Sequence, residues 1–177
     1  MEEVTENAEG PYFGPLEAPV PLDVTHDVSG FDCGVEDLND WLRNRALKNE
    51  GRFSRTYVVC VKNKVVAFYC ISAGSVQRSD APGKLRRNAP DAIPVSIIGR
   101  LAVSQAYAGK GIRSDILADA MNRIAHASQK IGIGAVLVQA KDDASKRFYM
   151  SCADFLPFPE SGRTLFLPID TLIAAYN

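Results

Sequence analysis

The stretch IIGRLAVSQAYAGKGIRS, residues 97–114, runs from an apolar segment through a short glycine-bearing loop into a helix start. This order suits a pyrophosphate, because the first amide groups of a helix lack intrahelical partners and carry the positive end of its dipole. Two glycines in the loop AGKGIR, residues 108–113, allow close approach to the backbone. A tight strand-to-helix turn with one lysine explains the hexapeptide equally well, because a glycine-rich loop alone is weak evidence.

Length and composition indicate one ordinary globular domain. The chain has 177 residues, of which 46% are hydrophobic and 23% charged, enough for a single sizeable core. No apolar run reaches the roughly 18 residues that a membrane span needs, and no basic residue precedes the first apolar positions. These features argue against secretion and membrane insertion and favour a cytoplasmic protein.

The four cysteines show no pattern typical of a metal or redox site. They form no C-x-x-C pair and have no histidine-rich segment nearby, so no metal is expected. A hairpin with its turn at Asn63-Lys64 does not place Cys60 opposite Cys70, as a disulfide would require. We therefore expect buried, reduced thiols.

Charge is distributed unevenly along the chain. Residues 1–42 hold eleven of the 21 acidic residues and no lysine or arginine, so residues 43–177 hold 20 basic and ten acidic residues, a net +10. Such an excess makes an anionic partner such as nucleic acid plausible, although scattered solvated cations are the ordinary alternative.

The chain divides into an acidic, Pro- and Gly-rich tail, residues 1–20, predicted to be flexible, and one domain, residues 21–177. Periodicity, turn residues and the capping aspartates predict the elements of this domain. We expect a strand over 22–28, a helix over 35–49, a hairpin of 55–61 with 65–72, an exposed loop over 74–94 with or without a short helix, a strand over 95–103, a helix over 113–129, a buried strand over 135–140, a helix begun by Asp142 or Asp143, a strand over 164–169 and a closing helical turn over 170–176.

Two of these helices have clear apolar stripes. In the helix over 35–49 the stripe consists of Leu38, Trp41, Leu42, Ala46 and Leu47. In the helix over 113–129 the buried side consists of Ile112, Ile116, Leu117, Ala120, Met121 and Ile124.

The order of a central LAV strand, a glycine loop, a long helix, a buried strand and a helix bearing Phe148-Tyr149 resembles the GNAT superfamily of acetyl-coenzyme A-dependent N-acetyltransferases. The resemblance covers roughly residues 20–170. It is closer to the toxin branch, which acetylates the amino group of aminoacyl-tRNA and is neutralised by a ribbon-helix-helix antitoxin. The segments that carry it are FDCG (31–34) with Leu38, Trp41 and Leu42, RRNAPD (86–91), GRLAV (99–103), KDD (141–143), FY (148–149) and LFLP (165–168).

The resemblance implies a mixed α+β fold, with a central, mostly antiparallel sheet that contains a splayed strand pair and is flanked by helices. It implies acetyl-CoA as the cofactor, an antitoxin partner and a homodimer. The implied cofactor-binding residues are Leu101, Ala102, Val103, Ala108, Gly109, Lys110, Gly111, Ile112, Arg113, Ser114 and Phe148. By the same resemblance, the Val103 N–H donates to the thioester oxygen and Tyr149 protonates the departing sulfur, a role that suits a neutral phenol.

The glycine loop departs from the family pattern of Gln or Arg, two variable residues, Gly, one variable residue, and Gly or Ala. Here Ala108 takes the first place and Arg113 the last, while Gly111 is kept. Arg113 can block the phosphates, or it can bind them through paired hydrogen bonds. We expect acetyl-CoA to bind still. A second departure is Ala153-Asp154-Phe155, where relatives more often have Gly-Phe.

No general base is evident. The sequence has no glutamate between Glu50 and Glu160, and neither His26 nor His126 falls in a matching catalytic position. A lysine amine, with a pKa of about 10.4, needs such a base, whereas an α-amine titrates near about 7.7–8.0. The missing base therefore favours an α-amine substrate. The α-amine of an aminoacyl-tRNA, which the resemblance implies, fits both this preference and the net +10 charge of residues 43–177. The candidate phosphate contacts are Arg43, Arg45, Lys48, Arg78, Lys84, Arg86 and Arg87.

Two alternatives stay open at this stage. One is a GNAT enzyme that acetylates a small amine or a protein N-terminus. The other is a catalytically impaired GNAT fold that acts as a binding module, which Ala108 and Arg113 suggest.

Overall fold

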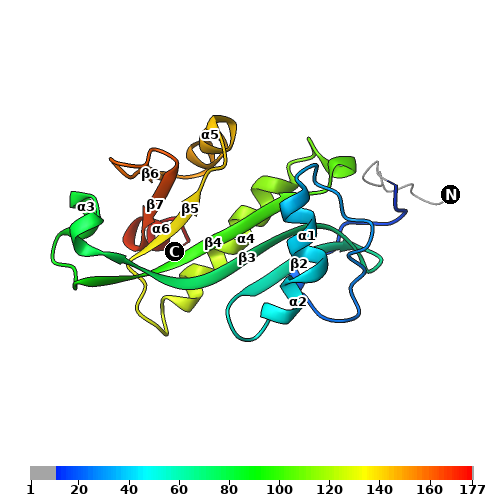
Figure 1. Ribbon diagram of the computed structural model, residues 1–177, viewed down its shortest axis with the longest axis horizontal. Coiled ribbons are helices and arrows are strands. Elements are labelled where there is room, and N and C mark those ends of the chain that lie inside the picture. The colour runs from blue at the N-terminus through cyan, green and yellow to red at the C-terminus, as the bar shows by residue number, and fades with distance from the viewer. Residues whose placement is uncertain (1–10, 177) are drawn as a thin grey trace. The chain divides into compact units, whose positions relative to one another are not determined.

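The computed structural model describes residues 11–176. Within them the strands form one sheet of seven in the order β1-β2-β3-β4-β5-β7-β6 (Figure 1). β4 and β5 are parallel, whereas β1 with β2, β5 with β7 and β6 with β7 are antiparallel, so the predicted mixed, mostly antiparallel sheet is confirmed. The strands are β1 (Val20–Pro21), β2 (Arg55–Val61), β3 (Lys64–Gln77), β4 (Ala92–Val103), β5 (Ala135–Gln139), β6 (Leu156–Pro157) and β7 (Thr164–Pro168).

The helices occur mainly where the sequence predicts them. They are α1 (Glu36–Asn44), α2 (Ala46–Asn49), α3 (Gly83–Arg86), α4 (Ile112–Ala127), α5 (Asp143–Cys152) and α6 (Ile169–Tyr176), with 3-10 turns η1 (Arg78–Asp80) and η2 (Gln105–Tyr107). The helix predicted over 35–49 is broken at Arg45, and Leu47, placed in its apolar stripe, is 45% exposed. Among residues 11–176, every helix is too short or too polar to cross a bilayer.

Residue contacts divide the described chain into two units. Unit 1 comprises residues 11–70 and 100–119, and unit 2 comprises residues 71–99 and 120–176. Strands β3 and β4 and helix α4 each contribute residues to both units.

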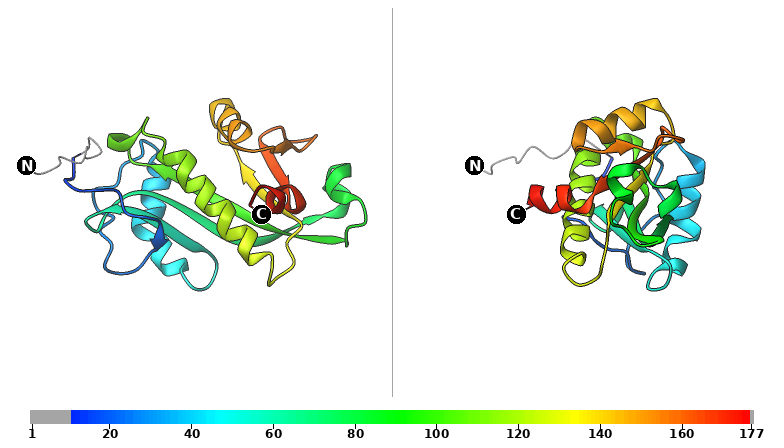
Figure 2. Two further views of the ribbon diagram at one scale, coloured as in Figure 1. Left: turned by 180° about the vertical axis from the view of Figure 1, so that it is seen from behind. Right: turned by 90° about the vertical axis from the view of Figure 1, so that its left-hand side faces the viewer.

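In unit 1, helices pack on both faces of β3. Phe68 belongs to the core cluster with Trp41 and Leu42 of α1, and its ring stacks on Trp41 at 6.0 Å. The next residue, Tyr69, is fully buried and donates a hydrogen bond to Asp119 of α4. Successive strand residues point to opposite faces, which explains why α1 and the first half of α4 lie on opposite sides of β3 (Figure 2). The six residues predicted to form the buried side of α4 are all buried.

In unit 2, the predicted loop over 74–94 is too long. β3 continues to Gln77 and β4 begins at Ala92, which leaves only residues 78–91 between the strands. The extended strands pack Val76, Ile93 and Val95 around Leu85 of α3. Burial of these β-branched side chains outweighs the turn signal of the glycines and prolines nearby.

The strand predicted over 22–28 is also wrong. Only Val20 and Pro21 pair with β2, opposite Val58 and Tyr57. Downstream, the Asp23 carboxylate accepts from Thr25 N–H at 2.8 Å. Such side-chain bonds to the backbone compete with a strand ladder.

The β2–β3 hairpin is confirmed, but its turn is Lys62-Asn63 rather than Asn63-Lys64. Both turn residues have left-handed φ values, 47° and 67°, typical of a two-residue hairpin turn. Cys60 and Cys70 are free thiols, and burial raises the pKa of Cys60 to about 11.

Candidate functional site

The end of β4 extends past its parallel partner. The β4–β5 register runs from Val95 with Ala135 to Ile98 with Val138, whereas β4 continues to Val103. Residues 99–103 therefore lie beyond the paired part of β4, in the stretch where the family resemblance implies a splay. Leu101 and Ala102 are buried and Val103 is half-buried. On this edge, main-chain groups of residues 101–103 can bond to something other than a strand.

The glycine loop after η2 adopts a conformation that glycine favours. Gly109 and Gly111 have φ values of +77° and +79°, and a Cβ built on either meets no atom within 4 Å. Glycine is therefore favoured at these two positions by the backbone conformation, and not because a side chain would clash with the rest of the protein. Because α4 begins at Ile112, the loop lies at a helix N-terminus, where amides and the helix dipole favour an anion.

The neighbours of these glycines complete this part of the site. Ala108, Lys110 and Ser114 are exposed and Arg113 is half-buried in the first turn of α4. The Lys110 ammonium lies over the Tyr107 ring at 5.4 Å. The loop therefore combines a helix N-terminus with two cationic side chains.

Unit 2 carries the other predicted residues on α5. Asp142, one of the two aspartates predicted to begin this helix, is the N-cap, and its carboxylate accepts from Ser145 N–H at 2.8 Å. This hydrogen bond is the main reason that the pKa of Asp142 is lowered. Tyr149 is 6% exposed, and its ring contacts Phe148 at 5.3 Å and Phe155 at 6.0 Å between centroids. Aromatic neighbours thus limit the orientations open to the Tyr149 ring.

Replacing the cap tests how α5 is held. Asp142→Ala should lower the thermal midpoint at neutral pH, because Ser145 N–H loses its acceptor, whereas Asp142→Asn should retain most of the midpoint. Since the folded pKa is lowered, the contribution is present above the unfolded pKa of about 4 and is lost as pH falls through the folded value. Thermal melts from pH 7 to pH 3 should show the Asp142→Ala difference shrinking below about pH 4. An equal difference at pH 3 and pH 7 would contradict this assignment.

The predicted phosphate contacts lie in both units. Arg43, Arg45 and Lys48 are in unit 1, and Arg78, Lys84, Arg86 and Arg87 are in unit 2. Two of them have protein partners: Arg43 donates to the Phe31 carbonyl, and Arg78 pairs with Asp91 at 2.6 Å. The other five are exposed, and those of unit 2 lie on or beside α3.

No metal centre is evident in the described part of the chain, since no three His, Cys, Asp or Glu residues there are grouped to hold an ion. His126 is exposed on α4, with its Nδ1 2.8 Å from the Asn122 carbonyl oxygen.

Comparison with known proteins identifies the family. No family model matches the chain. A curated relative, the tRNA-acetylating toxin of Mycobacterium tuberculosis, is 42% identical over 134 residues, which cover 75% of this chain and 81% of the relative. The chain belongs to the family of tRNA-acetylating toxins. The predicted GNAT superfamily and its toxin branch are thereby confirmed.

Solved structures of a toxin in this family share the fold. AtaT complexed with acetyl-methionyl-tRNAfMet matches with a TM-score of 0.82 and 28% identity over 92% of this chain and 99% of AtaT. A tyrosine-to-phenylalanine variant of AtaT, bound to the C-terminus of the antitoxin AtaR and acetyl-CoA, matches with a TM-score of 0.77, 26% identity, and coverage of 92% and 99%. The predicted GNAT fold is confirmed.

Sequence reasoning missed the residues that hold the site's backbone. The FDCG segment served only as a family marker, yet its Asp32 carbonyl accepts from Gln105 N–H at 2.8 Å, next to the predicted cofactor residues. No local pattern signals this contact, because the two residues are distant in sequence.

Proposed function

We propose that this toxin-family chain is an acetyl-CoA-dependent N-acetyltransferase that acetylates the α-amino group of aminoacyl-tRNA and so blocks translation. The observation that carries the proposal is the glycine loop after the end of β4, with two left-handed glycines exposed just before and at the start of α4. Membership in the tRNA-acetylating toxin family supports the same reaction.

The loop suits acetyl-CoA, which supplies the activated acetyl group when bound. Main-chain groups of Leu101, Ala102 and Val103 would hold its pantetheine arm, and the segment from Ala108 to Ser114 its phosphates. With no atom near the built Cβ positions of Gly109 and Gly111, phosphate oxygens can approach the amides. Arg113 and Lys110 add positive charge, so we infer that Arg113 binds a phosphate and does not block it.

Two groups would carry the chemistry. The Val103 N–H, at the end of β4, would donate to the carbonyl oxygen as negative charge develops there. The Tyr149 hydroxyl would donate its proton to the departing sulfur. Phe148, beside Tyr149 on α5, would contribute to the cofactor pocket.

An α-amine remains the favoured acceptor. Residues 51–159 contain no glutamate, and His126 already has Nδ1 within hydrogen-bond distance of a helix carbonyl. An α-amine has a lower pKa than a lysine side chain, so its deprotonation depends less on a general base. AtaT has been captured with acetyl-methionyl-tRNAfMet, the product of such a reaction.

Phosphate contacts from the α3 region can be tested by salt dependence. Replacing Lys84, Arg86 and Arg87 together with alanine should raise KM for aminoacyl-tRNA and lower the slope of log KM against log salt by about 2, at about 0.7 per lost contact. Arg78 is left in place because it pairs with Asp91. The control variant replaces Arg52, Lys62 and Lys130 with alanine. These side chains are exposed, so the control loses the same amount of positive charge. Equal slopes for both triple variants would exclude an RNA contact at α3.

We also propose an antitoxin of the ribbon-helix-helix type, a homodimer and a cytoplasmic location. The antitoxin is supported by the complex of AtaT with AtaR. Light scattering on the purified chain tests for a homodimer. Co-purification with the product of the gene next to the toxin gene tests for binding of an antitoxin.

One assay separates the competing functions. Purified protein is incubated with labelled acetyl-CoA and total charged tRNA, and label is followed in the aminoacyl fraction. Label in that fraction supports the proposal, and label only in added small amines or peptides supports the first alternative. Binding of acetyl-CoA without any transfer supports an impaired binding module.

A further inference from the structure

The loop that precedes α1 is held by a closed set of hydrogen bonds. The Asp32 carboxylate accepts from Gly34 N–H at 2.9 Å and from the Asn39 side-chain amide at 3.0 Å. The Asn39 side-chain oxygen accepts in turn from Cys33 N–H at 2.9 Å. Asn39 is 2% exposed, so its amide is a buried polar group whose hydrogen bonds are directed at this loop and at the start of α1. One carboxylate and one amide therefore fix the path of residues 31–34.

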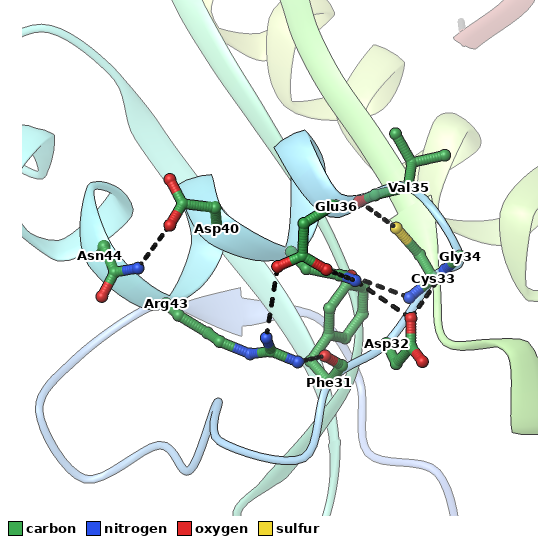
Figure 3. A network of polar contacts seen from close by, with 10 residues as sticks. Phe31, Asp32, Cys33, Gly34, Val35, Glu36, Asp40, Arg43 and Asn44 are labelled. Atoms are coloured by element: carbon green, nitrogen blue, oxygen red, sulfur yellow. Dashed lines mark hydrogen bonds and ion pairs between the residues drawn. The ribbon is translucent and has the colours of Figure 1, made fainter.

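A second anchor reinforces the loop from α1. The Arg43 guanidinium donates to the Phe31 carbonyl and lies 3.9 Å from the Glu36 carboxylate (Figure 3). The Gly34 and Asn39 hydrogen bonds lower the pKa of Asp32, which keeps the carboxylate charged and accepting at neutral pH.

The backbone of this loop contacts the segment that follows β4. The Asp32 carbonyl accepts from Gln105 N–H at 2.8 Å and from the Ser104 hydroxyl at 3.2 Å. Ser104 is 9% exposed, and its own N–H donates to the Val66 carbonyl of β3 at 2.8 Å. Ser104 is thus hydrogen-bonded to β3 through its backbone and to the loop through its side chain. It directly follows Val103 in the chain.

Gly34 brings the loop against the Gln105 side chain. Its φ is +83°, and a Cβ built on it would lie 2.4 Å from Gln105 Nε2. The loop conformation and the placement of Gln105 are therefore mutually dependent.

We propose that Asp32 and Asn39 are positioning residues that set the position of the acetyl-CoA loop and of the Val103 N–H through Ser104 and Gln105. This inference rests on the proposed function, because it assigns the two residues a role in cofactor binding and transfer. All of its contacts lie within unit 1. A displacement of about 1 Å at a reacting group can cost about 100-fold in rate, so a small shift of this loop is enough to be measured.

The test compares Asn39→Ala with the wild-type chain by calorimetric titration of acetyl-CoA and by steady-state acetylation of charged tRNA. We expect Kd for acetyl-CoA to rise at least about tenfold and kcat/KM to fall about 100-fold. KM for aminoacyl-tRNA should stay within about twofold, because the variant leaves the basic residues of α3 untouched.

Three further variants separate positioning from general stability. Leu42→Ala removes a buried side chain three residues further along α1 with no hydrogen bond to the loop, so it should lower the thermal midpoint without changing Kd. Asp32→Asn keeps an acceptor oxygen for both Gly34 N–H and Asn39, since both bonds end on one oxygen of Asp32. It should retain near wild-type binding, whereas Asp32→Ala should behave like Asn39→Ala.

The outcomes are distinct. If the wild-type chain binds no acetyl-CoA, the proposed function fails. If it binds acetyl-CoA and Asn39→Ala binds equally well, or if Leu42→Ala weakens binding as much, the positioning role fails while the proposed function stands. If Asn39→Ala does not fold, the Asp32→Ala and Asp32→Asn pair decides the question by the same two measurements.

Discussion

Replacing Tyr149 with phenylalanine is expected to lower kcat for acetyl transfer by about 100- to 10,000-fold, the range that a positioned proton donor contributes. The substitution removes one hydroxyl and keeps the ring, so the contacts with Phe148 and Phe155 remain. Kd for acetyl-CoA should therefore change by less than about threefold. Single-turnover transfer from labelled acetyl-CoA to charged tRNA measures the effect on chemistry alone.

The matched control for this variant is Tyr107→Phe. Tyr107 is also a buried tyrosine, but it lies in η2 and its hydroxyl contacts the backbone of Tyr12. Loss of the hydroxyl there should affect stability more than the chemical step. A Tyr149→Phe protein that transfers acetyl groups at the wild-type rate would remove Tyr149 from the mechanism. A tyrosine-to-phenylalanine variant of AtaT likewise has a solved structure.

Replacing Gly111 with valine is expected to abolish tight binding of acetyl-CoA while leaving the chain folded. A β-branched residue at a φ of +79° is strained by about 1–3 kcal/mol, and its side chain would fill the space through which phosphates approach the amides. Each hydrogen bond to a charged group contributes about 1.5–3 kcal/mol. Loss of even one such bond raises Kd at least about tenfold. Calorimetric titration measures this directly.

Gly132→Ala is the control for the loop variant. A Cβ built on Gly132 also meets nothing within 4 Å, but its backbone lies outside the left-handed region. This variant should bind acetyl-CoA like the wild-type chain. Equal binding by Gly111→Val would show that the phosphates do not lie on this loop.

Several elements could be predicted because their signals are local. The apolar stripe of α4 repeats every three to four residues, so periodicity alone identifies its buried face, from Ile112 to Ile124. The Asp142 cap needs only an acceptor three residues before Ser145. The glycine loop is likewise recognisable by its position between an apolar strand and an amphipathic helix.

Other elements were mispredicted where contacts distant in sequence decide the structure. Residues 74–77 and 92–94 contain glycine and proline and so look like a loop, yet they extend β3 and β4 because Val76 and Ile93 pack around Leu85. Residues 22–28 look like a strand, but the Asp23 side chain bonds the local backbone instead. A local sequence pattern does not show which of these competing contacts forms in the folded protein.

The sequence by itself determined most helices and strands and the candidate loop, because periodicity, capping and turn chemistry act over a few residues. The superfamily followed from the resemblance of several separated motifs. Only the tertiary structure decided what holds that loop in place. Asp32 and Ser104 lie 72 positions apart, and their contact forms only when α1 and the end of β4 pack in the same unit. The path of a backbone segment at such a site depends on long-range hydrogen bonds, and these leave no periodic trace in the sequence.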